Sequence, residues 1–294
     1  MVIKKTISGR VFDIVNYSFM ALILIIMIYP FLYVLNYSVS TPALIKNPLL
    51  LLPAGVNFRN YAILFSNADI FKALFISVSR SILGPLSMMV VTSMAGYAIS
   101  RKDLIWGRFF RIYFIATMYF TAGIIPTYLL YKNLGLTGNY LVYIIPGMVN
   151  VFNMILVKTY IESLPPSLEE AVLIDGGSEL DAFWRVLLPL CLPVNAAILL
   201  FCCISNWNSY IDTQLYNAMN HNLYSLQYVL YNALAVQLSA SLDQAKAAAG
   251  NANRVTEQSL KMAITVVTVV PIVCVYPFLQ KYFVSGLLVG SIKA

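Results

Sequence analysis

Acidic side chains gather in one short stretch of a chain that is otherwise strongly apolar. The stretch reads LPPSLEEAVLIDGGSELDAFWRVLLP, from Leu164 to Pro189, and apolar sequence flanks it on both sides. The chemistry that such a set offers is charge, available either to recognise a basic partner or to keep a loop in water. It holds five of the twelve acidic residues of the protein: Glu169, Glu170, Asp175, Glu179 and Asp181.

The first half of this segment has the signals of a short helix. Pro165 and Pro166 end the preceding apolar run, and Ser167 stands three residues before Glu170, which is the spacing of a capping box. In such a box the serine hydroxyl accepts the Glu170 amide, and the Glu170 carboxylate reaches back. The sequence therefore predicts a helix from Leu168 to about Ile174.

The second half repeats the pattern after a turn. Asp175-Gly176-Gly177 predicts that turn, because glycine enters left-handed conformations at little cost. Ser178, with Asp181 three residues on, is the cap signal of a second helix that runs toward Pro189. The predicted unit is helix, glycine hinge, helix.

Two interpretations of this unit remain open. A helix that anchors at a membrane surface is rich in Lys and Arg, whereas the anionic cytoplasmic lipid face repels an acidic one. Docking in a basic protein groove is the first interpretation. The second is that Glu170 only caps its helix and the acids only solvate the loop. If the unit docks, its expected apolar anchors are Leu168, Ala171, Val172 and Phe183.

Catalytic and metal-binding patterns are missing from the sequence. It contains no H-E-x-x-H, no Ser/His pair and no paired aspartates within its apolar runs. GLLVGSIK, from Gly286 to Lys293, has the wrong spacing for a phosphate-binding loop. His221 is the only histidine, and the sequence shows no His/Cys cluster of the kind that binds a metal. We expect a non-catalytic chain that binds no cofactor or metal itself.

Arg80 is the most unusual charge, because it lies well inside an apolar run. Ionisable residues within a membrane are costly and mark functional positions by default. A role along a translocation path, favouring anionic sugars, is one hypothesis; pairing with carbonyls or snorkelling is the other. Further candidates for lining a path, which aromatic belts or a core would explain equally, are Tyr119, Tyr128, Asn150, Asn153, Asn206 and Trp207.

The composition identifies the solvent of most of this chain as lipid. Of its 294 residues 60% are hydrophobic and 11% are charged, against about 25% charged in ordinary soluble domains. The net charge of +7 forms no basic stripe, so we expect no nucleic-acid partner. The start, MVIKKTISGR, resembles a signal peptide, but the apolar run that follows is too long, which indicates a retained span. The four cysteines, all within apolar runs, are expected to be buried thiols.

Six apolar runs are long enough to cross a bilayer, which needs about 20 residues. We expect a single helical membrane domain over residues 1–294, with a loop at 163–185, an outer loop at 206–261 and a tail at 284–294. Lys and Arg before the first run and around residues 101–111 indicate that both termini and the acidic loop are cytoplasmic. The predicted spans are 11–35, 71–99, 109–131, 140–157, 186–204 and 262–283.

The acidic segment resembles the EAA-x-x-x-G coupling motif of bacterial ABC importer permeases. It reads Glu170-Ala171-Val172-Leu173-Ile174-Asp175-Gly176-Gly177, where Val172 replaces the second alanine and Gly177 replaces the alanine after the glycine. Nearly the whole chain is similar to the carbohydrate-uptake branch, and most to the LplC/YtcP-type members, relatives of the maltose permease subunit MalG. The other similar stretches are AGYAISRK (Ala95–Lys102), GIIPTYLLYKNLGL (Gly123–Leu136), NWNSYIDTQLY (Asn206–Tyr216) and YPFLQKYFVSGLLVGSIKA (Tyr276–Ala294).

The resemblance implies an all-α ABC type I importer permease with six transmembrane helices, a coupling helix between spans four and five, and a place in the bacterial inner membrane. It implies a second, homologous permease subunit, two ATPase subunits that bind ATP and Mg, and an extracytoplasmic solute-binding protein. The imported substrate would be an oligosaccharide, such as uronate-containing fragments of alginate or pectin. Ser167, Leu168, Glu170, Ala171, Val172, Asp175, Gly176 and Phe183 would then form the ATPase contact.

Two further roles follow from the resemblance, and one alternative stays open. The tail from Tyr282 to Lys293 would reach toward the ATPases, and the outer loop from Trp207 to Leu226 would meet the binding protein. The alternative is a secondary transporter driven by an ion gradient. The spans carry almost no carboxylate for ion coupling, which speaks against it.

Overall fold

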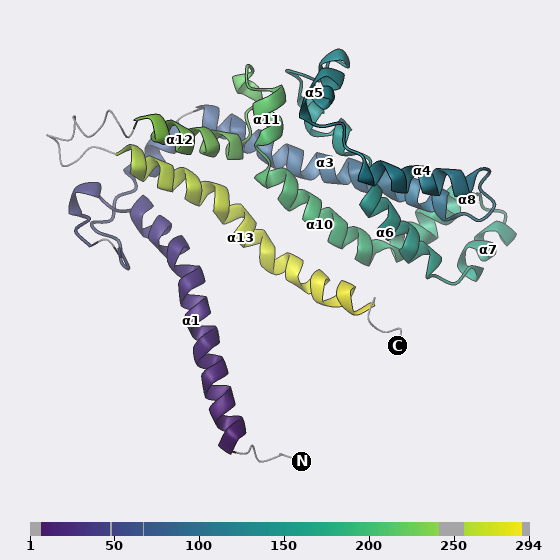
Figure 1. The fold of residues 1–294 in the computed structure, drawn as a ribbon, viewed down its shortest axis with the longest axis horizontal. Helices are drawn as coiled ribbons and strands as arrows, with labels where there is room; N and C mark the ends of the chain where they lie inside the picture. The colour runs from purple at the N-terminus through teal and green to yellow at the C-terminus, as the bar shows by residue number, and fades with distance from the viewer. Residues whose placement is uncertain (1–6, 48, 67, 241–255, 290–294) are drawn as a thin grey trace. The chain divides into compact units, whose positions relative to one another are not determined.

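The computed structural model describes residues 7–47, 49–66, 68–240 and 256–289, and these residues form helices, turns and loops without a β-strand (Figure 1). The predicted all-α class is thus confirmed for this part of the chain. The α-helices are α1 (Ile7–Ser38), α2 (Arg59–Ser66), α3 (Ala68–Ser100), α4 (Gly107–Tyr119), α5 (Ile124–Asn133), α6 (Val151–Glu162), α7 (Ser167–Ile174), α8 (Glu179–Asp181), α9 (Leu188–Leu190), α10 (Leu192–Asn208), α11 (Ile211–Tyr216), α12 (Leu226–Ala240) and α13 (Glu257–Val289).

Short helical turns connect these helices. Most are 3-10 turns, but the segment labelled η4 is a π-helix, in which each turn holds more residues than in an α-helix. The segments are η1 (Pro42–Leu44), η2 (Tyr140–Tyr143), η3 (Ile145–Gly147), η4 (Ala182–Leu187) and η5 (His221–Leu223).

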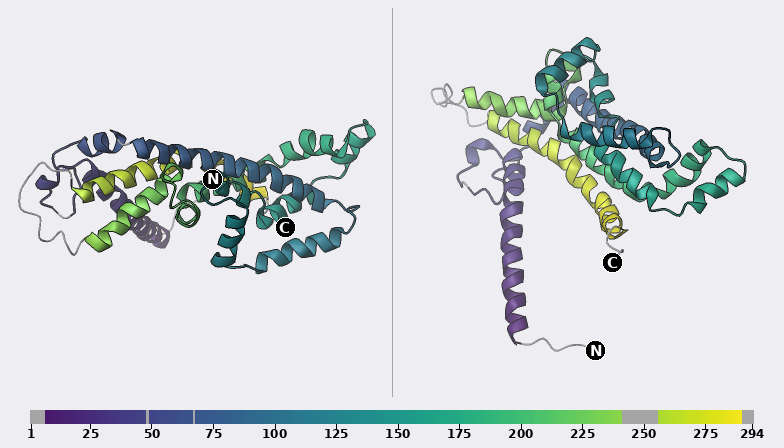
Figure 2. Two further views of the ribbon diagram at one scale, coloured as in Figure 1. Left: turned by 90° about the horizontal axis from the view of Figure 1, so that it is seen from above. Right: turned by 45° about the vertical axis from the view of Figure 1, so that its right-hand side comes forward.

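The chain divides into two compact units, one of residues 1–67 and 233–270 and one of residues 68–232 and 271–294. The prediction of a single domain therefore stays a prediction, and each unit is described by itself. In the second unit α3 packs along α6 and α10, as Figures 1 and 2 both show. Its core lies where α3, α6, η4 and α10 meet, and consists of Met88, Tyr97, Val157, Ile161, Phe183, Leu187, Cys191 and Ile198.

Small and polar side chains bring α3 close to its neighbours, as in other membrane helix bundles. A Cβ atom added at Gly96 would lie 3.1 Å from the Met154 carbonyl oxygen, so a larger residue would push α3 and α6 apart by a few tenths of an ångström. On α10, the Asn195 amide oxygen accepts a 3.1 Å hydrogen bond from the Ser93 hydroxyl. Thr92 donates to the Met148 carbonyl at 3.0 Å. These contacts fix α3 against both helices.

Three of the six predicted spans are bent rather than straight. The stretch 109–131 breaks between α4 and α5 with a bend of 118°, where Gly123 has a φ of +83°. The stretch 140–157 bends by 44° between η3 and α6, and 186–204 bends by 74° at Cys191. The last bend places Pro193 in the first turn of α10, where its missing N–H leaves no hydrogen bond unmade. Pro85, by contrast, lies within the continuous helix α3.

Among the described residues, two helices are long and apolar enough to cross a membrane, at Ser8–Ser38 and Ala68–Ser100. The number rises to five if each bent pair makes one span. A sixth predicted span, 262–283, lies within α13. The last residues of the predicted tail, 290–294, and residues 241–255 of the outer loop lie outside the described part of the chain.

A buried asparagine, Asn60, joins three helices of the first unit. The Asn60 amide donates to the Ser38 carbonyl at the end of α1 with a 2.7 Å hydrogen bond. Its oxygen accepts from the Ser259 hydroxyl of α13 at 3.0 Å. Asn60 therefore links α1, α2 and the start of α13. Beyond this junction the side chains of α1 are almost all exposed, as in a helix that faces lipid or another protein.

Candidate functional site: the acidic hairpin

The acidic segment forms a hairpin of α7 and α8 that projects from one end of the bundle (Figure 2). The chain leaves α7 through a Schellman motif, in which the Gly177 amide donates to the Val172 carbonyl at 2.9 Å and the Gly176 amide to the Leu173 carbonyl at 3.1 Å. Gly176 has a φ of +82°, a conformation that strains any residue with a Cβ atom. The predicted turn at the glycines is confirmed, and it is a helix cap, whereas the hinge role of Gly176 stays a prediction.

The expected capping box at Ser167 is wrong. Pro166 is the N-cap residue, and no side chain bonds the free amides of this helix end. Pro166 already has helical dihedrals, and its carbonyl accepts the Glu170 amide at 3.2 Å. Ser167 is therefore the first residue inside the helix, and Glu170 is free of the capping role that the sequence suggested.

The capping box at the second helix is confirmed. The Ser178 hydroxyl accepts from the Asp181 amide at 3.2 Å, and the Asp181 carboxylate accepts from the Ser178 amide at 3.1 Å. The Ser178 hydroxyl and then Arg185 hold the pKa of Asp181 below its usual value. This box fixes the direction in which the chain enters η4.

The first helix of the hairpin has two different faces. Glu170, Ala171 and Ile174 point outward, and Ile174 is 84% exposed although it is apolar. Leu168, Glu169 and Val172 are half-buried on the opposite face. Residues four apart are neighbours on a helix surface, so Glu170 lies beside Ile174 on the outward face and Leu168 beside Val172 on the inward face.

Three of the predicted apolar anchors therefore do not form an exposed docking face. Leu168 and Val172 belong to the inward stripe, and Phe183 is 1% exposed in the core. Phe183 stacks on Tyr97 of α3 with ring centroids 5.4 Å apart. No local pattern indicated this, because a phenylalanine after a turn fits a surface anchor and a core residue equally.

The two departures from the EAA pattern lie in contact. A Cβ atom added at Gly177 would lie 2.7 Å from Cγ1 of Val172 and 3.0 Å from the Val172 carbonyl oxygen. The methyl group of Val172 thus occupies the space that an alanine at 177 would need. Relative to the two alanines of the motif, the larger Val172 therefore occurs together with the smaller Gly177.

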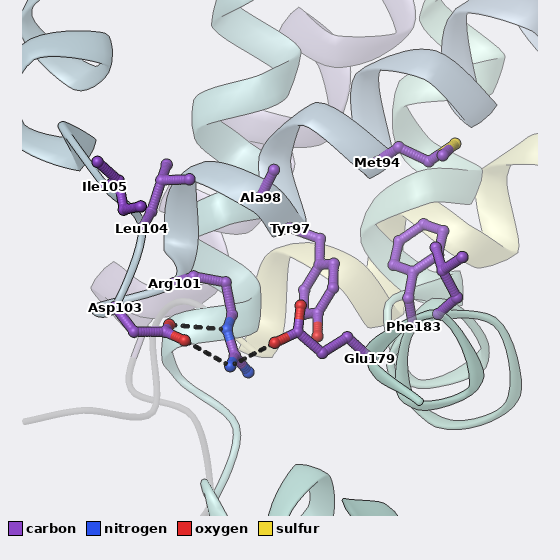
Figure 3. Close-up of a pocket in the computed structure, with 10 residues that line it drawn as sticks. Met94, Tyr97, Ala98, Arg101, Asp103, Leu104, Ile105, Glu179 and Phe183 are labelled. Atoms are coloured by element: carbon purple, nitrogen blue, oxygen red, sulfur yellow. Dashed lines mark hydrogen bonds and ion pairs between the residues drawn. The ribbon is translucent and has the colours of Figure 1, made fainter. Parts of the chain in front are cut away.

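The hairpin is tied to the end of α3 by Arg101 and Tyr97. The Arg101 guanidinium forms ion pairs with Glu169 of α7 and, at 3.1 Å, with Glu179 of α8. The Tyr97 hydroxyl donates to the Glu169 carboxylate at 2.5 Å. Asp103 completes the cluster by pairing with Arg101 at 3.0 Å (Figure 3). We call Tyr97, Arg101, Asp103, Glu169 and Glu179 the arginine cluster.

The electrostatics of this cluster favour its charged form. The hydrogen bond to Asp103 and the nearby carboxylates hold the pKa of Arg101 above its usual value. Arg101 in turn lowers the pKa of Asp103. Next to the cluster lies a cavity of about 480 Å³. Its wall also includes apolar side chains of α3, the 101–106 loop, α8 and η4, among them Met94, Leu104, Leu180 and Phe183.

Arg80 lies far from this hairpin along α3, and its partner is a carboxylate. The guanidinium is 1% exposed and forms two hydrogen bonds with Asp212 of α11, one of them 3.1 Å long. It also lies over the Tyr143 ring, 4.3 Å from the centroid. Because Arg80 is buried and paired within this chain, it cannot contact a sugar in this conformation.

Most of the other path candidates have local structural contacts. Asn150 caps α6 by accepting the Asn153 amide at 3.0 Å. Asn206 donates to the Cys202 carbonyl at 2.9 Å, and Trp207 is 8% exposed. Tyr128 stacks on Tyr216 at a centroid separation of 6.0 Å, whereas Tyr119 is 81% exposed. Asn153 also donates to the Cys202 sulfur at 3.6 Å, so Asn150, Asn153 and Asn206 lie near one another.

Comparison with known proteins shows to which family this chain belongs. No protein-family model matches the sequence. The polygalacturonan/rhamnogalacturonan transport system permease protein YtcP of Bacillus subtilis (strain 168) is 35% identical over 288 residues, which cover 97% of this chain and 99% of that protein. The chain belongs to the permease subunits of carbohydrate ABC importers. Protein LplC of the same organism is 34% identical, covering 98% of this chain and 97% of its own length.

A solved structure supports the same family. It is the crystal structure of a bacterial ABC transporter involved in the import of the acidic polysaccharide alginate, with a TM-score of 0.85 and 28% identity. The match covers 96% of this chain and 100% of that one. The permease is therefore a membrane component for carbohydrate import, and its relatives are non-catalytic subunits of such systems.

Several residues of the site were missed by the sequence analysis. Arg101 was considered only as a topology signal and Glu169 only as one acid among five. Tyr97 lies in the last turn of α3 and Arg101 directly follows this helix, and a spacing of four residues could have indicated a common partner. Nothing in the sequence pointed to Asp212 as the partner of Arg80, because 132 residues separate them.

Proposed function

We propose that this permease subunit passes acidic oligosaccharides across the bacterial inner membrane, using ATP hydrolysed by separate subunits. Its partners in this proposal are a second permease subunit, two ATPases and an extracytoplasmic binding protein. Both termini and the hairpin face the cytoplasm, in line with the Lys and Arg residues near residues 4–10 and 101–111. Six spans result if each bent pair crosses once and α13 crosses with α1 and α3.

The outward face of α7 is the observation that carries this proposal. Ile174 and Leu173 are 84% and 40% exposed, and Glu170 lies beside them. Exposed apolar side chains next to an acid suit a protein groove of opposite charge better than water or anionic lipid. The arginine cluster holds the rear of the same helix, so a force on the outward face would pass to α3.

Site-specific photo-cross-linking tests this contact. A photoreactive amino acid at position 171, on the outward face of α7, should cross-link the ATPase in membranes that contain the whole transporter. The matched control is position 219, where Met219 is 99% exposed and lies in the predicted outer loop. That position should cross-link the binding protein instead. Cross-linking of the ATPase from 219, or its absence from 171, would overturn the proposed arrangement.

The proposed substrate class comes from the named relatives. YtcP is named for polygalacturonan and rhamnogalacturonan, and the similar structure for alginate, all of which contain uronates. Uronate oligosaccharides should therefore stimulate ATP hydrolysis by the reconstituted transporter with its binding protein. Neutral fragments of equal length, such as maltooligosaccharides, should stimulate it at least about tenfold less. Equal stimulation by both kinds of oligosaccharide would contradict the proposal that the substrate is acidic.

The energy source distinguishes this proposal from a transporter driven by an ion gradient. Uptake into vesicles that contain ATP should persist after an ionophore collapses the proton and sodium gradients. It should stop when ATP is replaced by a non-hydrolysable analogue. The opposite pair of results would favour the ion-driven alternative.

A further inference from the structure

Two separate sets of charged side chains bond helix α3 to other parts of the second unit, one to α11 and one to the hairpin. Arg80 lies near its middle, whereas Tyr97 lies in its last turn and Arg101 directly follows it. At a rise of about 1.5 Å per residue, Arg80 and Tyr97 are roughly 26 Å apart along the helix. Between them α3 packs on α6 and α10, and it is one continuous helix through Pro85.

The first set of contacts joins α3 to residues 211–226, which comprise α11, η5 and the start of α12. Arg80 and Asp212 form its centre. The Leu226 amide donates to the Ser77 hydroxyl at 2.8 Å, and the Lys72 ammonium donates to the Asn222 side chain at 3.1 Å. Three points over two turns of α3 therefore hold this segment.

Aromatic and hydroxyl groups surround the Arg80–Asp212 pair. Below the guanidinium, the Tyr143 hydroxyl donates to the Leu223 carbonyl at 2.7 Å and lies 3.0 Å from the Thr213 hydroxyl. The Thr213 hydroxyl donates to that of Ser225 at 3.1 Å. Planar guanidinium and carboxylate groups that share two hydrogen bonds define one relative orientation, which an apolar contact does not.

We infer that the Arg80–Asp212 pair positions the 211–226 segment so that α3 carries its movement to the hairpin. This inference rests on the proposed function, in which that segment faces the binding protein and the hairpin faces the ATPase. Docking of the loaded binding protein shifts the segment, the bidentate pair makes α3 follow, and the arginine cluster makes the hairpin follow α3. Arg80 thus acts as a positioning residue, without touching the sugar.

The test replaces both members of the pair with apolar residues, as Arg80→Met together with Asp212→Leu. Replacing a buried ion pair as a whole avoids leaving one charge unpaired, so the variant should assemble in normal amount. Its basal ATP hydrolysis per assembled transporter should stay within about twofold. Stimulation by the sugar-loaded binding protein should fall at least about fivefold. Hydrogen exchange of residues 211–226 should be faster than in the unaltered transporter.

The single variant Arg80→Lys provides a second measurement, because it keeps the charge but loses the two-point geometry. Intermediate stimulation at normal assembly is expected. Full stimulation of the double variant at normal assembly would overturn the inference, as would a double variant that fails to assemble, since the pair would then serve folding alone. Failure of the proposed function has a different signature: the unaltered transporter itself would show no sugar-stimulated ATP hydrolysis, whatever the exchange of residues 211–226.

Discussion

At the scale of single residues, the neighbouring acids Glu169 and Glu170 have opposite environments. The Glu169 side chain is 21% exposed and is held by Arg101 and Tyr97. Glu170 points outward on the exposed face of α7. One residue of rotation along a helix thus separates a carboxylate that anchors the hairpin from one that is free to meet another protein.

Substituting each of these acids with glutamine should separate the two roles. Glu169→Gln should destabilise the hairpin by about 1–3 kcal/mol, because hydrogen bonds to charged groups contribute that much. Hydrogen exchange of residues 167–187 measures this loss. Glu170→Gln should leave that exchange unchanged and lower sugar-stimulated ATP hydrolysis at least about threefold. The reverse assignment of effects would contradict the two faces of α7.

At the scale of elements, the two helices of the hairpin begin differently: a serine side chain caps α8, whereas no side chain caps α7. Ser178→Ala should destabilise the start of α8 by about 1 kcal/mol, because it removes a capping hydroxyl. Ser167→Ala is the matched control, and it should change little, since Ser167 bonds no free amide of its helix. About fivefold faster exchange of the amides after residue 178, seen only in the first variant, is the expected result. Equal effects of the two substitutions would mean that Ser167 also caps its helix.

The contact between Val172 and Gly177 predicts non-additive mutations in the same hairpin. Gly177→Ala should cost about 1–3 kcal/mol, because the new methyl group overlaps Cγ1 of Val172. Val172→Ala combined with Gly177→Ala should recover most of this loss. A double-mutant cycle on the exchange rates of residues 167–187 measures the coupling. Simple additivity would mean that the hairpin relaxes around the overlap.

The elements were predictable where a local rule decides them. The turn at Gly176 and the cap at Ser178 follow from residue types a few positions apart, and both predictions are confirmed. Ser167 failed because two prolines start the helix one residue earlier than the serine signal suggests. Phe183, Arg80 and Arg101 take their roles from residues far away in the sequence, and no local pattern encodes such contacts.

At the scale of the whole molecule, the proposed topology assigns opposite sides of the membrane to two strongly exposed side chains. Cysteine introduced at Met219 should react with a membrane-impermeant maleimide added outside, whereas cysteine at Ile174 should react only after the membrane is opened. The unaltered chain is the blank, because the expectation that all four of its cysteines are buried is wrong: Cys191 is buried, whereas Cys274 is exposed. Labelling of Ile174→Cys in sealed cells would invert the topology.

The overlap between positions 172 and 177 also constrains the order in which this hairpin could have evolved from the alanine-containing pattern. A valine arriving first at 172 would have met the methyl group of an alanine at 177. A glycine arriving first at 177 would have opened the space at small cost. The less strained of the two orders therefore passes through a chain with glycine at 177 and alanine still at 172. Valine at 172 together with alanine at 177 should be the least stable of the four combinations.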